Sequence, residues 1–125
     1  MYIDLKGAPM KVVCFGPHAR IGALIGGDLV LDLNMAFAAC AHHQDGDPRP
    51  YAKADANLPA NLADFLNAGR PAIEAAKSII AWQAKSGKEI EGPAGEKVVA
   101  KRSELKILAP LPSMSSRIFC GGGNY

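Results

Sequence analysis

Short apolar runs with an alternating pattern open the chain and predict β-strands. Residues 11 to 15 form one β-rich run, Lys-Val-Val-Cys-Phe. Residues 21 to 33 predict a hairpin, because Gly26 and Gly27 before Asp28 supply the positive φ angles that a tight turn requires. On the second strand of this hairpin, leucine alternates with other residues, so one face is apolar and the other is mixed.

Two carboxylates, Asp28 and Asp32, share the mixed face of that second strand. Residues four apart on a strand lie about 13 Å apart along it, which is too far for joint acid and base chemistry. We expect Asp28 to belong to the turn and Asp32 to be a solvated strand end. Neither residue is therefore a candidate for catalysis.

The pattern becomes helical in the middle of the chain. Residues 35 to 42 are rich in alanine and predict a short helix, which the Gly and Pro residues of the loop at 44 to 50 should end. Asn61 is placed to cap a second helix that stops at Gly69. A third helix should begin at Pro71 and close at Gly87. Its apolar stripe is expected to consist of Ile73, Ala76 and Ile80, and Trp82 lies off that stripe.

Two further strand-like runs, at 97 to 100 and 105 to 108, follow a turn-rich connector at 88 to 96. We expect Trp82 to be partly buried within this domain, although packing on a partner domain is the alternative. Strands, then helices, then strands again predict an α+β fold. It should be a small, mostly antiparallel sheet with two or three helices on one side.

Composition is that of one ordinary globular domain. A chain of 125 residues can bury roughly two-thirds of its unfolded surface, which is enough for one modest core. The net charge of +2 is small and the basic residues are scattered, which argues against a nucleic-acid partner. There is no apolar run near the ~20 residues that span a bilayer and no signal-peptide pattern, so we expect no membrane association and a cytoplasmic location.

Cysteine usage does not indicate a disulfide framework or a zinc site. Cys14, Cys40 and Cys120 are odd in number, widely spaced and without a Cys-x-x-Cys pair. Cys14 and Cys120 both lie in apolar runs that predict strands. We interpret them as reduced core thiols rather than catalytic nucleophiles, because free cysteine is among the most buried residue types.

One loop carries a pattern that resembles metal ligands, formed by His42, His43, Asp45 and Asp47. The Asp-Gly-Asp triplet lacks the later ligands of a calcium loop, including the terminal glutamate. Adjacent histidines on a helix also point about 100° apart and cannot easily share one ion. A solvated loop is therefore the favoured interpretation, and the chain offers no metal ligands.

The last nine residues, 117 to 125, read Arg-Ile-Phe-Cys-Gly-Gly-Gly-Asn-Tyr and predict a short strand followed by a glycine turn. The three glycines could form an anion-binding nest, but no helix, Lys, Ser or Thr follows them, so a phosphate loop is not indicated. The bare sequence favours a flexible turn here.

This segment and residues 107 to 113, Ile-Leu-Ala-Pro-Leu-Pro-Ser, resemble a junction of the fumarylacetoacetate hydrolase family. In that family, Leu-Ala-Pro-x-Pro precedes Lys/Arg-Ile-x-Cys-x-Gly-x-Asn-Tyr and leads into the catalytic domain. Residues 10 to 33 are similar to the family's small N-terminal domain. Gly123 stands where an apolar residue is usual, which leaves the subfamily open.

The resemblance implies a function for a longer parent protein. Family members hydrolyse carbon–carbon bonds of oxo or diketo acids, or isomerise or decarboxylate related compounds, in the breakdown of aromatic compounds. They use Mg²⁺ or Mn²⁺ held by a carboxylate triad, and a histidine base that follows Asn-Tyr. These catalytic residues are absent from the chain, so it has no catalytic or metal residues of its own and no cofactor is expected in it.

The same resemblance implies a division of the chain. Residues 1 to 112 would be the N-terminal domain, and residues 113 to 125 the linker and the start of a truncated catalytic domain. Gly122, Asn124 and Tyr125 would lie at the edge of the substrate pocket. The partners implied are a small oxo acid, the chain's own catalytic domain and a second subunit of a homodimer. Alternatively, the chain is a complete small binding module, derived from that domain and without catalysis.

Overall fold

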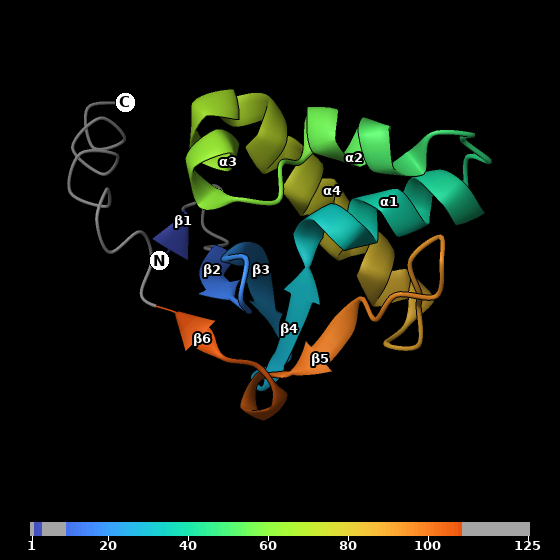
Figure 1. Cartoon of the computed structure of the whole chain (residues 1–125). Coiled ribbons are helices and arrows are strands. Elements are labelled where there is room, and N and C mark those ends of the chain that lie inside the picture. The colour runs from blue at the N-terminus through green and yellow to red at the C-terminus, as the bar shows by residue number, and fades with distance from the viewer. Residues whose placement is uncertain (1, 4–9, 109–125) are drawn as a thin grey trace.

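The computed structural model describes residues 2–3 and 10–108, and these form one antiparallel sheet with helices packed on it (Figure 1). The α+β class and the antiparallel sheet predicted from the sequence are confirmed. The strands are β1 (Tyr2–Ile3), β2 (Met10–Phe15), β3 (Arg20–Ile25), β4 (Leu29–Asp32), β5 (Val99–Lys101) and β6 (Ile107–Leu108). The helices are α1 (Leu33–His43), α2 (Pro50–Asn57), α3 (Leu62–Ala68), α4 (Arg70–Ser86) and the short 3₁₀ helix η1 (Arg102–Glu104).

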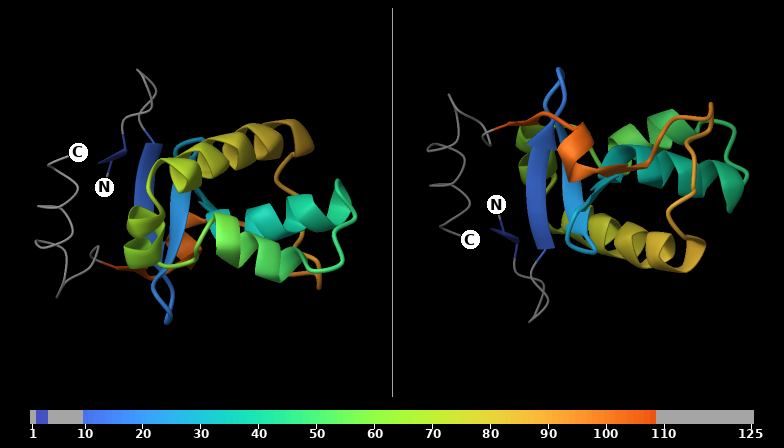
Figure 2. Two further views of the ribbon diagram at one scale, coloured as in Figure 1. Left: turned by 90° about the horizontal axis from the view of Figure 1, so that it is seen from above. Right: turned by 90° about the horizontal axis from the view of Figure 1, so that it is seen from below.

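The sheet runs in the order β1-β2-β3-β4-β5, and β6 also pairs with β2. Two short strands therefore pair with β2. Tyr2 of β1 lies opposite Lys11 of β2, and Leu108 of β6 lies opposite Cys14 of β2. Because η1 connects β5 to β6, the chain returns from one edge of the sheet to the other. The sheet curls as a half-barrel, and η1 crosses the face that is turned away from the α-helices (Figure 2).

The predicted hairpin is confirmed. Strands β3 and β4 pair antiparallel with Ile25 opposite Leu29, and the turn between them has φ angles of 56° at Gly26 and 82° at Gly27. Side chains with a Cβ are disfavoured at such angles, so the two glycines fix the position of the turn. This register also sets Asp32 opposite Gly22, at the point where β4 leads directly into α1.

The predicted caps of α3 and α4 are confirmed as well. The Asn61 side chain accepts a hydrogen bond from the Asp64 amide at 2.8 Å, and Gly69 has the positive φ expected where α3 stops. Pro71 lies in the first turn of α4 and Gly87 follows its end.

Helix α2 was not predicted. Its sequence has no strong apolar stripe, but Pro50 takes the first helical position, where a missing amide hydrogen has no cost. Ala54 is fully buried, so the helix is held by tertiary packing on its neighbours rather than by its own propensity.

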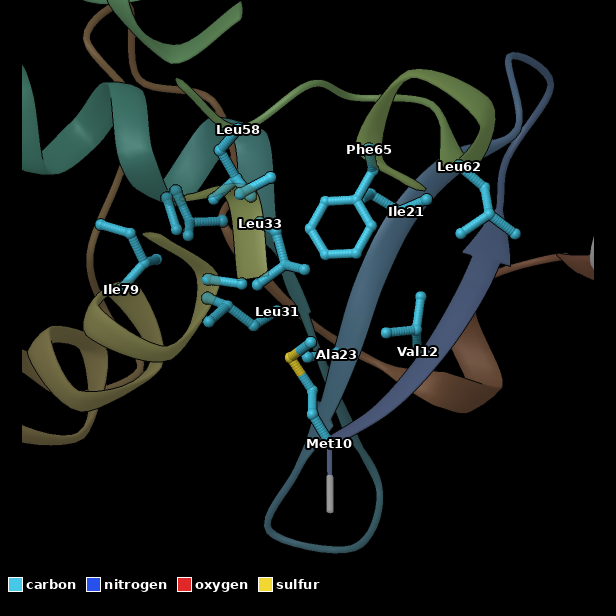
Figure 3. Close-up of a cluster of buried hydrophobic side chains, with 14 of the residues drawn as sticks. Met10, Val12, Ile21, Ala23, Leu31, Leu33, Leu58, Leu62, Phe65 and Ile79 are labelled. Carbon is cyan, nitrogen blue, oxygen red and sulfur yellow. The ribbon is translucent and has the colours of Figure 1, made fainter. Parts of the chain in front are cut away.

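The main core fills the space between the sheet and the α-helices. In Figure 3, Phe65 from α3, Ile21 from β3 and Leu33 from α1 point into this space. Cys14 is buried here too, as predicted for a core thiol. The expected stripe of α4 faces the core, with Ala76 buried and Ile73 and Ile80 partly buried against it, but the stripe was incomplete. The buried positions of α4 are Ala72, Ala76, Ile79 and Gln83, and Trp82 is partly buried against the core as predicted.

A second, smaller cluster lies on the other face of the sheet. Its buried members are Val13, Phe15 and Val30, and they pack with the partly buried Leu24, Leu105 and Ile107. Successive side chains of β2 point to opposite faces of the sheet. Val12 and Cys14 therefore belong to the main core, and Val13 and Phe15 to the second cluster. Gly22 provides the space for this cluster. A Cβ on it would lie 2.6 Å from Val30 Cγ1 and 2.9 Å from the Leu31 carbonyl oxygen.

We predict that Gly22→Ala lowers the free energy of unfolding by about 1–3 kcal/mol, because overpacking forces neighbouring atoms to move. In a Val30→Ala background the cost should be about 1 kcal/mol smaller, since one of the two clashes is gone. Urea unfolding of the four proteins of this cycle measures both quantities. Equal costs of Gly22→Ala in the two backgrounds would contradict the packing described here.

Candidate functional site

The site residues that the sequence proposes, Gly122, Asn124 and Tyr125, lie outside the described residues, as does the rest of the motif after Leu108. The candidate chemistry of the described part therefore has to be sought elsewhere. Its most connected group of polar side chains lies where the first residue of β3, the start of α1 and helix α2 meet. We call Arg20, Asp32, Asn34 and Asp55 the junction cluster.

The centre of the junction cluster is a bidentate ion pair. Arg20 Nε donates to Asp32 Oδ2 at 2.8 Å, and Arg20 Nη2 donates to Asp32 Oδ1 at 2.9 Å. Two parallel charge-assisted bonds of this kind fix orientation as well as distance. The hydrogen bonds to Asp32 are the main reason why the pKa of Arg20 is raised, and they outweigh burial, which lowers it. Arg20 is thus a permanent cation.

Asn34 extends the junction cluster to α2. Arg20 Nη2 also donates to Asn34 Oδ1 at 3.1 Å, and Asn34 Nδ2 donates to Asp55 Oδ1 at 3.1 Å and to the Leu58 carbonyl at 2.8 Å. The amide therefore uses both its acceptor and its donors. One side chain, itself buried, connects the first residue of β3 with the C-terminal end of α2.

Asp32 also caps helix α1. Its Oδ1 accepts a hydrogen bond from the Met35 amide at 3.1 Å, and its own backbone amide donates to the Val98 carbonyl at 2.9 Å. The expectation that Asp32 is a solvated strand end was wrong, because the residue is only 9% exposed. A local signal for this role existed: an Asp immediately before an alanine-rich helix is typical of an N-cap. Arg20 and Asn34 carried no such signal, since their partners are distant in sequence.

The junction cluster can hold structure, but it offers little to a ligand. Both oxygens of Asp32 and both ends of the Asn34 amide are engaged within the protein. Among the described residues, no buried side-chain nitrogen or oxygen lacks a hydrogen-bond partner. The cluster has no Ser, Cys, Lys or His, and Arg20 engages both oxygens of its more buried carboxylate, Asp32. We therefore interpret the cluster as the joint between sheet and helices, and not as a reaction centre.

The histidine and aspartate pattern at the end of α1 is spread over several partners. His43 Nε2 lies 3.0 Å from the Glu91 carbonyl, and the ring of His42 meets that of His43 edge to face at 4.8 Å. Asp45 and Asp47 lie 3.8 and 3.6 Å from Lys53 Nζ. Over the ranges 2–3 and 10–108, no group of three or more His, Cys, Asp or Glu side chains is arranged to hold a metal ion.

The surroundings of two cysteines and of one tyrosine disfavour the reactive, deprotonated form of each side chain. Burial is the main factor that raises the pKa of the Cys14 and Cys40 thiols, which disfavours the nucleophilic thiolate. The Tyr51 hydroxyl donates to Glu96 at 2.5 Å, and this hydrogen bond raises the pKa of Tyr51 and lowers that of Glu96. The pair ties α2 to the connector before β5.

Comparison with known proteins gives no relative: no family model, no curated protein and no solved structure matches this chain. Within the described residues, no helix is both long enough and apolar enough to cross a membrane.

We predict that Arg20→Met lowers the free energy of unfolding by about 2 kcal/mol or more, because it leaves the Asp32 carboxylate largely buried without its counter-charge. The matched control is Lys97→Met, which breaks an exposed ion pair to Glu104 and should have a far smaller effect. Urea unfolding at neutral pH compares the two. Equal losses would mean that Arg20 is only a surface residue.

A second pair of variants separates the two roles of Asp32. Asp32→Asn keeps a side-chain oxygen that can cap α1 but removes the charge, whereas Asp32→Ala removes both. The alanine variant should therefore be less stable than the asparagine variant by about 1 kcal/mol. Thermal and urea unfolding, followed by circular dichroism, test this. If the two variants are equally stable, the cap contributes nothing to α1.

Proposed function

We propose that this chain is the non-catalytic N-terminal portion of a metal-dependent enzyme of the fumarylacetoacetate hydrolase family. The parent would act on oxo or diketo acids by carbon–carbon bond hydrolysis, isomerisation or decarboxylation, in the breakdown of aromatic compounds. The observation that carries the proposal is the ordered motif Leu-Ala-Pro-x-Pro at 108 to 112 followed by Arg-Ile-x-Cys-x-Gly-x-Asn-Tyr at 117 to 125.

The arrangement of the described residues supports this division of labour. The described residues before the motif already form a buried apolar core between the sheet and the α-helices. The part that precedes the motif thus has a core of its own. Its polar groups at the junction cluster are committed to structure, which suits a domain that does no chemistry itself.

The metal of such an enzyme does not fit the described residues. Mg²⁺ and Mn²⁺ prefer several oxygen ligands around one point. Here Asp32 is paired with Arg20, while Asp45 and Asp47 face Lys53. The proposal therefore assigns the cation, and the histidine base, to residues beyond this chain. The complete enzyme would work in the cytoplasm as a homodimer, with Gly122, Asn124 and Tyr125 at the edge of its oxo-acid pocket.

The test begins with the coding sequence after Tyr125. We expect a histidine and a glutamate within a few codons and a carboxylate triad far downstream. The longer protein should then turn over acylpyruvates or fumarylacetoacetate, lose this activity with EDTA and regain it with Mg²⁺ or Mn²⁺. The 125-residue chain is the matched control and should be inactive under all these conditions.

Two results would contradict the proposal. A stop codon directly after Tyr125 would favour a small binding module that has no enzyme attached. Metal-dependent turnover by the purified 125-residue chain would place catalytic residues where none are expected. Inactivity of the longer protein toward oxo acids, with the triad present, would instead redirect the search to other substrates of the family.

A further inference from the structure

The segment from Arg102 to Leu108, formed by η1 and β6, closes the half-barrel over the second apolar cluster. We call it the latch. Leu105 and Ile107 of the latch pack against Val13, Phe15 and Val30 on the sheet face opposite the α-helices. Leu108 reaches the rim of the main core. The latch is thus the cover of one face of the sheet, and it connects the two edges formed by β5 and β2.

Among the described residues, few contacts hold the latch. None of its seven residues is buried, and its three apolar members are only partly so. Strand β6 pairs with just two residues of β2, Cys14 and Phe15. Two further backbone hydrogen bonds fasten it: Gly16 N to Lys106 O at 3.0 Å and Arg102 N to Asp28 O at 2.7 Å. In its ion pair, Glu104 with Lys97, both side chains are exposed to solvent.

The other face of the sheet is held much more firmly. The main core joins β2, β3 and β4 to three α-helices through fully buried side chains such as Ile21, Leu33 and Phe65. Backbone hydrogen bonds from Ile21 to Ala60 at 2.7 Å and from Asp32 to Val98 at 2.9 Å lie on this side. The segments that open most easily in a folded protein are those with few buried apolar contacts and exposed hydrogen bonds, which describes the latch and not the helical side.

We propose that the latch opens as a unit while the main core stays folded. Opening breaks the pairing of β6 with β2 and the hydrogen bonds of Gly16 and Arg102, and it uncovers Val13 and Phe15. The joint at Asp32 is unaffected, because its partners lie on the helical side. This inference does not depend on the proposed function, since it concerns only residues 10 to 108.

Amide hydrogen exchange on the full 125-residue chain, followed by NMR, tests the proposal. The amides of Gly16 and Arg102 report on the latch, and those of Ile21 and Asp32 report on the main core. We expect protection factors of the first pair to be at least about tenfold below those of the second, which corresponds to an opening that is easier by about 1.4 kcal/mol.

Two variants sharpen the test. Ile107→Ala should speed exchange at Gly16 and Arg102 about tenfold further and leave Ile21 and Asp32 unchanged, because only the cover of the second cluster is weakened. Ile79→Ala, which removes a buried side chain of α4, should instead speed exchange at Ile21 and Asp32. Equal protection of all four amides in the unaltered chain would overturn the proposal. So would equal acceleration of all four by Ile107→Ala.

Discussion

Asp32 satisfies three demands at the point where the last residue of β4 becomes the cap of α1. Its carboxylate pairs with Arg20, its Oδ1 accepts the Met35 amide, and its own amide donates to Val98. The direction in which α1 leaves the sheet is set here, and α2 packs on α1 in turn. Asn34 then links the C-terminal end of α2 to the same cation. This joint and the main core together orient the helical layer on the sheet.

The sheet itself has two unequal sides. The helical side has a continuous core of aliphatic side chains, and the opposite side has three buried residues under a short cover. Gly22 matters on the second side because a side chain at this position would occupy the space that Val30 and Phe15 fill. Packing this close leaves no room for a larger residue at position 22. The small cluster therefore depends on glycine at this position as well as on its apolar side chains.

This asymmetry bears on the proposed function. If the chain is the N-terminal part of a longer enzyme, the catalytic part is joined to it through the less firmly held latch, whereas the helical layer is fixed by the junction cluster. The described side chains that resemble catalytic or metal groups have structural partners instead: Lys53 for Asp45 and Asp47, and the Glu91 carbonyl for His43. The chemistry of the parent would then depend on residues outside this domain.

Local patterns in the sequence determined the elements whose cause is local. The two glycines of the β3–β4 turn, the Asn61 cap and the stops at Gly69 and Gly87 all act within a few residues, so the hairpin and helices α3 and α4 could be predicted. The α+β class followed from their order. The motif at the end of the chain suggested a family, although its residues after Leu108 lie outside the described structure.

Only the tertiary structure decided the features that depend on distant partners. Helix α2 is held by the burial of Ala54 against its neighbours, and the buried residues of α4 include Ala72 and Ile79, which lie outside the predicted stripe. Asp32 looks like a surface residue until Arg20, twelve positions earlier, is brought beside it. Propensity and periodicity report on neighbours in sequence, whereas a bidentate pair and a curled sheet are formed between residues that only folding brings together.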